Sequence, residues 1–149
     1  MQQLNLPPYP FRFRKTNGQD EIFDKTRRRY VSLTAEEWVR QHFLMYLHLH
    51  LGYPLSTMAV EKSIKVNRMP RRFDIVVYIR SGKPGMLVEC KAPEIELTQD
   101  VLDQAGRYNL SLNVPYIIIT NGMKHLCCRF DEQERSWKFL EMIPRYSDL

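Results

Sequence analysis

The chain has 149 residues, of which 44% are hydrophobic and 26% are charged, as expected for one globular domain with a substantial core. No apolar run is long enough to cross a membrane, and the first residues lack the pattern of a signal peptide. Three cysteines cannot form a complete set of disulfides and lack zinc-site spacing, so we expect a reducing, cytoplasmic setting. The net charge of +5 favours a polyanionic partner only moderately and does not identify one.

Residues 1–30 are predicted to form an N-terminal arm, and residues 31–149 a single domain. Apolar and basic residues alternate at the start of the arm, and Asn17-Gly18 is a typical hairpin turn, so the arm is predicted to contain a β-hairpin. The densest basic cluster is the run from Arg27 to Arg29. We interpret this run as a solvated loop or, if the fold places it beside the functional site, as a contact for phosphate.

A helix is predicted from Thr34 to Leu51. Thr34 with Glu37 three residues later is the pattern of a capping box, apolar residues recur at helical spacing, and Gly52 is a typical helix end. The histidines around this helix lack the ordered spacing of metal ligands, so we interpret them as core or surface residues.

Residues 59–66 are predicted to form a strand that leads into a central antiparallel hairpin. Two apolar, β-branched runs flank residues 81–85, which have the composition of a turn. The hairpin contains Asp74, Glu89 and Lys91, and charged residues are seldom buried unless they are paired or hold a metal. Glu89 and Lys91 are two residues apart on a strand and therefore share a face. Two carboxylates and a lysine at one sheet edge can hold a hard divalent cation and polarise a water.

A second helix is predicted from Thr98 to about residue 112, followed by a buried strand over residues 115–120. Residues 126–130 and 137–140 are predicted as two further edge strands. The predicted order is therefore helix, three strands, helix and strand, with strands added at both ends.

The spacing of Asp74 and Glu89-Cys90-Lys91 resembles the signature of PD-(D/E)XK nucleases. Its context resembles the N-terminal nuclease domain of type I restriction enzyme R proteins, because a similar helix precedes the hairpin and Gln104 and Tyr108 match a following QxxxY helix motif. The resemblance covers about residues 30–125, and Phe73 stands where the signature name has proline.

The resemblance implies a fold and an activity. The fold would be a restriction-endonuclease-like core of αβββαβ order, with a mixed central sheet flanked by helices and with strands added at both ends. The activity would be Mg²⁺-dependent hydrolysis of DNA phosphodiester bonds, with Mn²⁺ as a substitute, in restriction-modification. The partners would be DNA and a motor subunit, a specificity subunit or a second copy of the chain, with no membrane contact. The chain contains no P-loop pattern, so it has no P-loop motor of its own.

The resemblance also implies residue roles. Asp74, Glu89 and the backbone carbonyl of Cys90 would hold the metal, and the Cys90 side chain would be a small core residue. Lys91 would orient the attacking water or stabilise developing negative charge. Such nucleases often supply a further acidic residue from the first helix, which would be Glu37 or its neighbour Glu36; we assign Glu37 as catalytic.

Gln104 and Tyr108 would face DNA. Each assignment has a simpler alternative. Capping alone explains Glu37, a structural ion pair explains Lys91 beside the two carboxylates, and Tyr108 and Gln104 can be a core aromatic and a surface polar residue. The alternative for the whole chain is a module of the same fold that binds DNA or protein without cutting.

Overall fold

The computed structural model describes residues 1–66 and 68–149, with the backbone alone at residues 66 and 108–112. An antiparallel three-stranded sheet, here called the meander, comprises β1 (Phe13–Thr16), β2 (Gln19–Asp24) and β3 (Arg29–Ser32). The predicted hairpin is β1 and β2, and Asn17 and Gly18 form its turn with φ of 50° and 78°. The third strand was not predicted. The division of the chain into an arm and a domain stays a prediction.

The second sheet of the described chain is six-stranded and mixed, and we call it the main sheet. Its strands are, in spatial order, β4 (Met58–Val66), β5 (Met69–Tyr78), β6 (Pro84–Cys90), β7 (Tyr116–Thr120), β8 (His125–Asp131) and β9 (Ser136–Leu140). The β6–β7 pair is parallel and the other pairs are antiparallel. The strand β8 lies between β7 and β9, so the prediction of two C-terminal edge strands is wrong for β8 and correct for β9.

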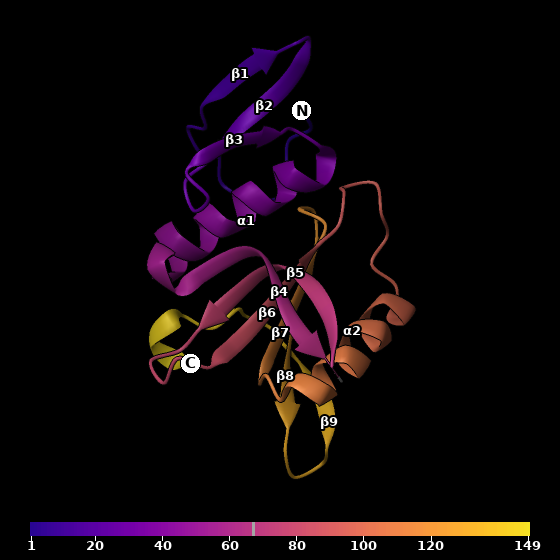
Figure 1. Ribbon diagram of the computed structural model, residues 1–149. Helices are drawn as coiled ribbons and strands as arrows, with labels where there is room; N and C mark the ends of the chain where they lie inside the picture. The colour runs from indigo at the N-terminus through magenta and orange to yellow at the C-terminus, as the bar shows by residue number, and fades with distance from the viewer. Residues whose placement is uncertain (67) are drawn as a thin grey trace.

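The helices α1 (Ala35–Leu51) and α2 (Gln99–Leu112) cover opposite faces of the main sheet. Figure 1 shows α1 between the meander and the main sheet, with α2 beyond the other face. Short 3₁₀ turns occur at Leu55–Thr57 and Tyr146–Asp148. The predicted order of helix, three strands, helix and strand is confirmed. Neither described helix combines the length and hydropathy of a membrane span.

Two apolar clusters form the core on the two faces of the sheet. On one face, Phe43 and Leu47 of α1 pack with Ile75 and Val88, and on the other Ala105 of α2 packs in a cluster with neighbouring strand residues. These helical residues recur at spacings of three and four, which is why one side of each helix is buried.

Side-chain alternation along β5 is interrupted at Asp74. Ile75 and Val77 belong to the cluster of α1, whereas Phe73 and Val76 belong to the cluster of α2. Residues that are two apart on a regular strand share a face, so the assignment of Phe73 and Ile75 to different clusters marks a local irregularity. Asp74 lies at the irregularity.

The first turn of α1 is capped by Thr34, as predicted. The Thr34 hydroxyl accepts a hydrogen bond from the Glu37 N–H at 3.0 Å. The N–H of Thr34 donates to the Ser32 carbonyl, so the Glu37 carboxylate does not complete a reciprocal capping box in the described structure. The helix ends at Gly52, whose φ of 77° allows its N–H to reach the Leu47 carbonyl.

The residues before the meander are attached to the main sheet. Leu4 is buried in the cluster of α1, and the Asn5 N–H donates to the Gly122 carbonyl at 2.8 Å. A Cβ atom at Gly122 would lie 2.8 Å from Leu4 Cδ2, so a side chain at Gly122 would displace Leu4.

Candidate active site

Three of the predicted site residues, Asp74, Glu89 and Lys91, come together where β5 lies beside the end of β6, and β6 pairs on its other side with the parallel strand β7. The pairing of Ile75 with Val88 extends by one step to bring Asp74 beside Glu89. Lys91 follows β6 directly, and its backbone N–H donates to the carbonyl of Thr120 at 2.8 Å. The β5–β6 hairpin and the strand β7, which follows α2 in the sequence, therefore assemble this site.

The Asp74 carboxylate is buried and accepts three hydrogen bonds from two residues. Its Oδ2 accepts a hydrogen bond from the Cys90 N–H at 2.8 Å. Its Oδ1 accepts from Nε and Nη2 of Arg40 at 3.1 Å and 2.6 Å. The Cys90 side chain is 1% exposed in the cluster of α1, which confirms its predicted place in the core.

The Glu89 carboxylate is less well satisfied. Burial and then the charge of Asp74 raise the pKa of Glu89 to about 7, and the charges of Arg71 and Lys91 oppose this rise. Among the described residues, no donor forms a hydrogen bond to the buried Glu89 Oε1, and Arg71 Nη2 lies 4.0 Å from it. Asp74 is buried and the Glu89 side chain is 15% exposed, so their negative charges repel each other unless a proton or a cation offsets them. Arg40 supplies such a cation to Asp74, whereas the buried Glu89 Oε1 keeps an acceptor site that a proton or a cation can occupy.

The two glutamates of the first helical turn have different surroundings. Glu37 Oε1 accepts from Arg27 Nη2 and Arg40 Nη1, each at 2.7 Å, and Glu37 Oε2 accepts from Gln41. These contacts favour a structural role for Glu37.

Glu36 instead interacts with the candidate site. Burial and then the charge of Asp74 raise the pKa of Glu36, while Arg40 and Lys91 oppose the rise. The Glu36 side chain is 49% exposed, so it is open to a ligand from solvent. Glu36 Oε1 also lies 3.6 Å from Nη2 of Arg40, the residue that holds Asp74.

Arg40 and Glu61 also belong to the site, although the sequence analysis did not identify them. Arg40 is buried, and its Nη2 lies 2.6 Å from Glu61 Oε1 as well as contacting Asp74. Burial opposes the charge of Arg40, but Asp74, Glu37 and Glu61 together raise the pKa of Arg40 above its ordinary value. Arg40 precedes Phe43 at helical spacing, and a charged residue on an apolar helix face could have revealed it.

Glu61 has a strained backbone. Its φ is 56°, and the ladder between β4 and β5 skips it at the position opposite Asp74. Left-handed residues other than glycine are uncommon, and they cluster at functional sites where the surrounding structure holds them. The strain directs attention to this position, which no pattern in the sequence marks.

A second buried cluster lies beside the first. Asp24 is fully buried, and its carboxylate accepts hydrogen bonds from the backbone and side chains of Thr26 and Arg27. Burial raises the pKa of Asp24, but these hydrogen bonds and the Arg27 charge outweigh burial and lower it. Because Arg27 bridges Asp24 and Glu37, Arg27 is a structural residue and not a free contact for phosphate.

The two residues assigned to DNA contact lie on α2. Gln104 is exposed. Tyr108 belongs to α2, but its side chain lies outside the described residues. Their roles therefore stay predictions.

The residues of the site fit a small divalent cation. No set of three or more His, Cys, Asp or Glu side chains is arranged to hold a metal in the described chain. Mg²⁺, however, is commonly held by one or two carboxylates, with waters and substrate oxygens completing the octahedron. Asp74 and Glu89 provide such carboxylates, and Glu89 Oε1 is a buried acceptor that a cation would satisfy.

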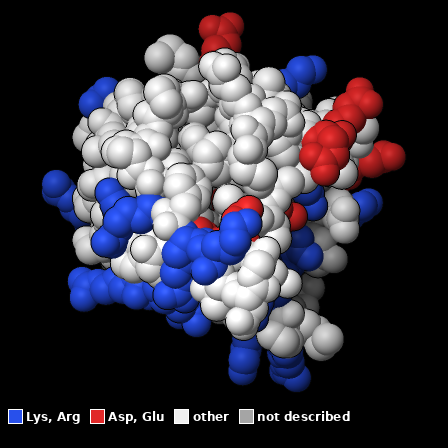
Figure 2. All heavy atoms as spheres, turned by 90° about the horizontal axis from the view of Figure 1, so that it is seen from above, with Lys and Arg blue, Asp and Glu red and all other residues white. Residues whose placement is uncertain are grey.

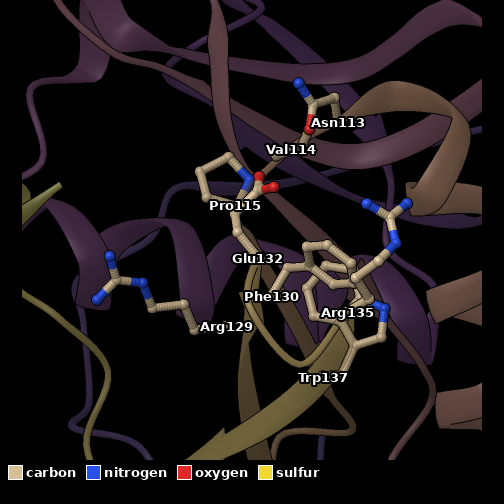
Figure 3. A pocket seen from close by; sticks show the side chains of 8 residues that line it. All are labelled: Asn113, Val114, Pro115, Arg129, Phe130, Glu132, Arg135 and Trp137. Atoms are coloured by element: carbon tan, nitrogen blue, oxygen red, sulfur yellow. The ribbon is translucent and has the colours of Figure 1, made fainter.

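A pocket at the opposite end of the main sheet does not contain these residues. It lies between the end of α2, the start of β7 and the β8–β9 hairpin. Figure 3 shows Arg135 beside the rings of Phe130 and Trp137, whereas the guanidinium of Arg129 points away from them. Because Tyr116 of β7 pairs with Met86 at the start of β6, this pocket is remote from Glu89 at the end of β6.

Comparisons with known proteins agree with this architecture. A solved structure described as a fragment of an HsdR subunit of a type I restriction enzyme from Vibrio vulnificus YJ016 matches with a TM-score of 0.56 and 20% identity. The match covers 78% of this chain and 24% of that chain, so the present chain spans about a quarter of it and shares its fold. No curated protein matches. A family model described as the N terminus of the type I restriction enzyme R protein matches residues 35–144. The match covers most of the chain, which therefore belongs to the family of type I restriction enzyme R protein N-terminal regions.

Proposed function

We propose that this protein is a Mg²⁺-dependent DNA endonuclease of the PD-(D/E)XK type with a restriction-endonuclease-like core. The observation that supports the proposal most strongly is the pair of buried Asp74 and partly buried Glu89, in which the buried Glu89 Oε1 has no described donor, beside the Lys91 ammonium. Burying two acidic groups together costs stability, and binding a divalent cation would offset this cost. Membership of a restriction enzyme family supports DNA as the substrate.

Each group would have a definite task. Asp74, Glu89 and the Cys90 carbonyl would hold the cation, which when bound polarises a phosphate oxygen and makes a water more acidic. Lys91 would donate hydrogen bonds to the attacking water or to the charge that develops on the phosphate. We propose Glu36, in place of Glu37, as the acidic residue that α1 adds to the site, because Asp74 and Lys91 act on its charge.

Arg40 would position Asp74. Its two hydrogen bonds to Asp74 Oδ1 fix the carboxylate, and Glu37 and Glu61 fix the guanidinium in turn. Each carboxylate oxygen has two lone pairs, so Asp74 Oδ2, which accepts one hydrogen bond, retains one acceptor site for a cation.

One observation favours the alternative, a module that binds without cutting. The guanidinium of Arg40 already neutralises Asp74, so this carboxylate is satisfied by the protein alone. In such a module Lys91 and Glu89 would serve only as charges near the bound partner, and no metal would be required.

The deciding experiment compares wild type with Lys91→Ala in two assays. Cleavage of plasmid, linear and single-stranded DNA is followed in Mg²⁺ and in Mn²⁺, and DNA affinity is measured in Ca²⁺ without turnover. We expect Lys91→Ala to lower the cleavage rate by about a hundredfold or more and to leave DNA affinity nearly unchanged. The exposed Lys124 serves as the matched control, and Lys124→Ala should behave as wild type in both assays.

The same preparations give an independent test of the metal site. Isothermal titration with Mg²⁺ or Mn²⁺ should show binding to wild type that is lost in Asp74→Asn. If wild type binds DNA but cuts no DNA in either metal, the endonuclease proposal is wrong and the binding module is correct.

We further propose that a motor subunit, a specificity subunit or a second copy of the chain acts with this protein. The support is the family assignment together with the match to a structure described as a subunit of a type I restriction enzyme. Isolation of the protein from its native cells with any bound partners, followed by an assay for ATP-dependent cleavage, would test this.

A further inference from the structure

The positive charge of this chain is concentrated in two segments. Residues 1–33 contain seven Lys or Arg and three Asp or Glu, a net charge of +4. Residues 58–73 contain five Lys or Arg and one Glu, again a net charge of +4. The rest of the chain contains 10 Lys or Arg and 13 Asp or Glu, a net charge of −3. The net positive charge of the chain therefore lies in these two segments, which attract a polyanion more strongly than the rest of the chain does.

Both segments adjoin the candidate site. The first is joined to α1 by Arg27, which pairs with Glu37 beside Glu36. The second contains Glu61 and continues into Asp74. Figure 2, which looks down on the meander, shows most Lys and Arg groups in the lower half of the face, around a recess where Asp and Glu groups are visible.

Each segment has exposed cations that no described ion pair uses, and three of these cations lie close together in the sequence of each segment. We call Lys25, Arg28 and Arg29 the basic loop, and Lys62, Lys65 and Arg68 the basic hairpin; all six side chains are exposed. None of the ion pairs among the described side chains uses these six, whereas Arg14 and Lys15 of the meander are paired with Glu21 and Asp20.

One arginine of each segment also has a strained backbone, as does Arg135 in the turn between β8 and β9. Arg28 and Arg68 have φ of 55° and 69°, a left-handed conformation that favours glycine or asparagine. Placing arginine there costs about 1 kcal/mol in each turn. A side chain at a strained, exposed position is consistent with a role in binding rather than in folding.

We propose that the basic loop and the basic hairpin bind the phosphate backbone of duplex DNA on two sides of the Asp74–Glu89 pair. Residues 25–29 and 62–72 contain no aromatic residue, although sites for single strands usually combine cations with rings that stack on bases. Lys and Arg alone contact phosphates without reading sequence. The proposal rests on DNA being the substrate of the proposed function, and it names the surface that holds the DNA.

The test measures binding without turnover. Fluorescence anisotropy of a short labelled duplex is recorded in EDTA at several salt concentrations with the full chain. The variants are Arg28→Ala/Arg29→Ala and Lys62→Ala/Lys65→Ala. The control, Arg80→Ala/Lys83→Ala, removes the same charge from the exposed turn between β5 and β6.

Each test variant should bind the duplex with an affinity at least about tenfold lower than that of wild type. The slope of log affinity against log salt concentration should fall by about two units, because each variant loses two cations. The control should retain wild-type affinity within about twofold, and a single strand of the same sequence should bind more weakly than the duplex. Equal weakening by the control would show a nonspecific effect of net charge and overturn the proposal. Unchanged binding by both test variants, or equal binding of the single strand, would also overturn it.

The two proposals can fail separately. If the duplex binds through these segments but is never cut, the binding surface stands and the endonuclease fails. If wild type cuts and Lys91→Ala does not, while both surface variants bind and cut normally, the endonuclease stands and this surface fails. Thermal melting of each variant excludes unfolding as the cause of weaker binding.

Discussion

Two buried carboxylate clusters lie side by side at the start of α1, and they differ in how fully they are satisfied. Asp24 and Glu37 share the Arg27 guanidinium, and their oxygens accept several further hydrogen bonds. In the second cluster, Arg40 donates hydrogen bonds to Asp74, whereas no described donor reaches Oε1 of the neighbouring Glu89. The first cluster is complete within the protein and contributes to folding. The second cluster leaves Glu89 Oε1 as an acceptor for a proton, a cation or a ligand.

The largest expected effect on stability breaks the complete cluster. Arg27→Ala leaves the buried Asp24 carboxylate and part of Glu37 without a cation, which costs about 3–5 kcal/mol for a buried pair. Urea unfolding should show this loss. Lys25→Ala changes an exposed cation in the same loop and should stay within about 0.5 kcal/mol of wild type. Similar losses in both variants would show that the two clusters do not differ as described.

The incomplete cluster should destabilise the metal-free protein as pH rises. The pKa of Glu89 is about 7 in the folded chain and 4.5 ordinarily, so between these values the folded state keeps a proton that the unfolded state releases. Stability therefore falls as pH rises from about 4.5 to 7 and levels off above that, by up to ~3 kcal/mol from this group.

Urea unfolding in EDTA across this pH range checks the prediction. Glu89→Gln should remove this decline, and Glu94→Gln, at an exposed carboxylate, should retain it. Saturating Mg²⁺ should also reduce the decline in wild type, because the cation replaces the proton. A pH dependence that is the same in wild type and Glu89→Gln would refute the assignment.

A smaller effect separates the neighbouring glutamates. Glu36→Gln should lower the cleavage rate about 10–100-fold, as for a group that supports a metal site, with little change in melting temperature. Glu37→Gln should lower the melting temperature, because Arg27 and Arg40 lose a shared carboxylate. Rates are compared per folded molecule. The reverse pattern would restore Glu37 as the catalytic residue.

The smallest effects are expected on α2. Gln104→Ala should weaken DNA binding or cleavage a few-fold, by about 0.5–1.5 kcal/mol for one lost hydrogen bond. Tyr108→Phe removes only a hydroxyl and should leave the melting temperature nearly unchanged. A large loss of stability in either variant, with normal activity per folded molecule, would show a role in folding instead of DNA contact.

Sequence patterns predicted the parts of the fold that local rules control. Thr34 as the N-cap, Gly52 as the helix end and the Asn17-Gly18 turn follow from backbone preferences of single residues. The apposition of Asp74 and Glu89 follows from the antiparallel pairing of β5 with β6 in one hairpin, whereas the break in alternation at Asp74 was not predicted.

The missed features depend on contacts between distant segments. Arg40 reaches Asp74 and Glu61 across 34 and 21 positions of sequence, and no periodicity specifies such a partner. Glu37 fitted two roles from its sequence position, and the contacts with Arg27 and Arg40 now favour the structural one. The exposed Arg29 belongs to a strand because its backbone pairs with Asp24, which composition alone does not indicate.

The parallel pairing of β6 with β7 has a consequence for how the molecule is made. Lys91 is anchored through Thr120, and the chain between them must complete α2 and return before that hydrogen bond can form. Contacts between residues far apart in sequence form slowly, because the chain loses loop-closure entropy before the contact can stabilise it. While β7 is still inside the ribosome, Thr120 is not available and Lys91 cannot yet be held in its final position. The candidate site is therefore assembled only with completed tertiary structure, after β7 has left the ribosome.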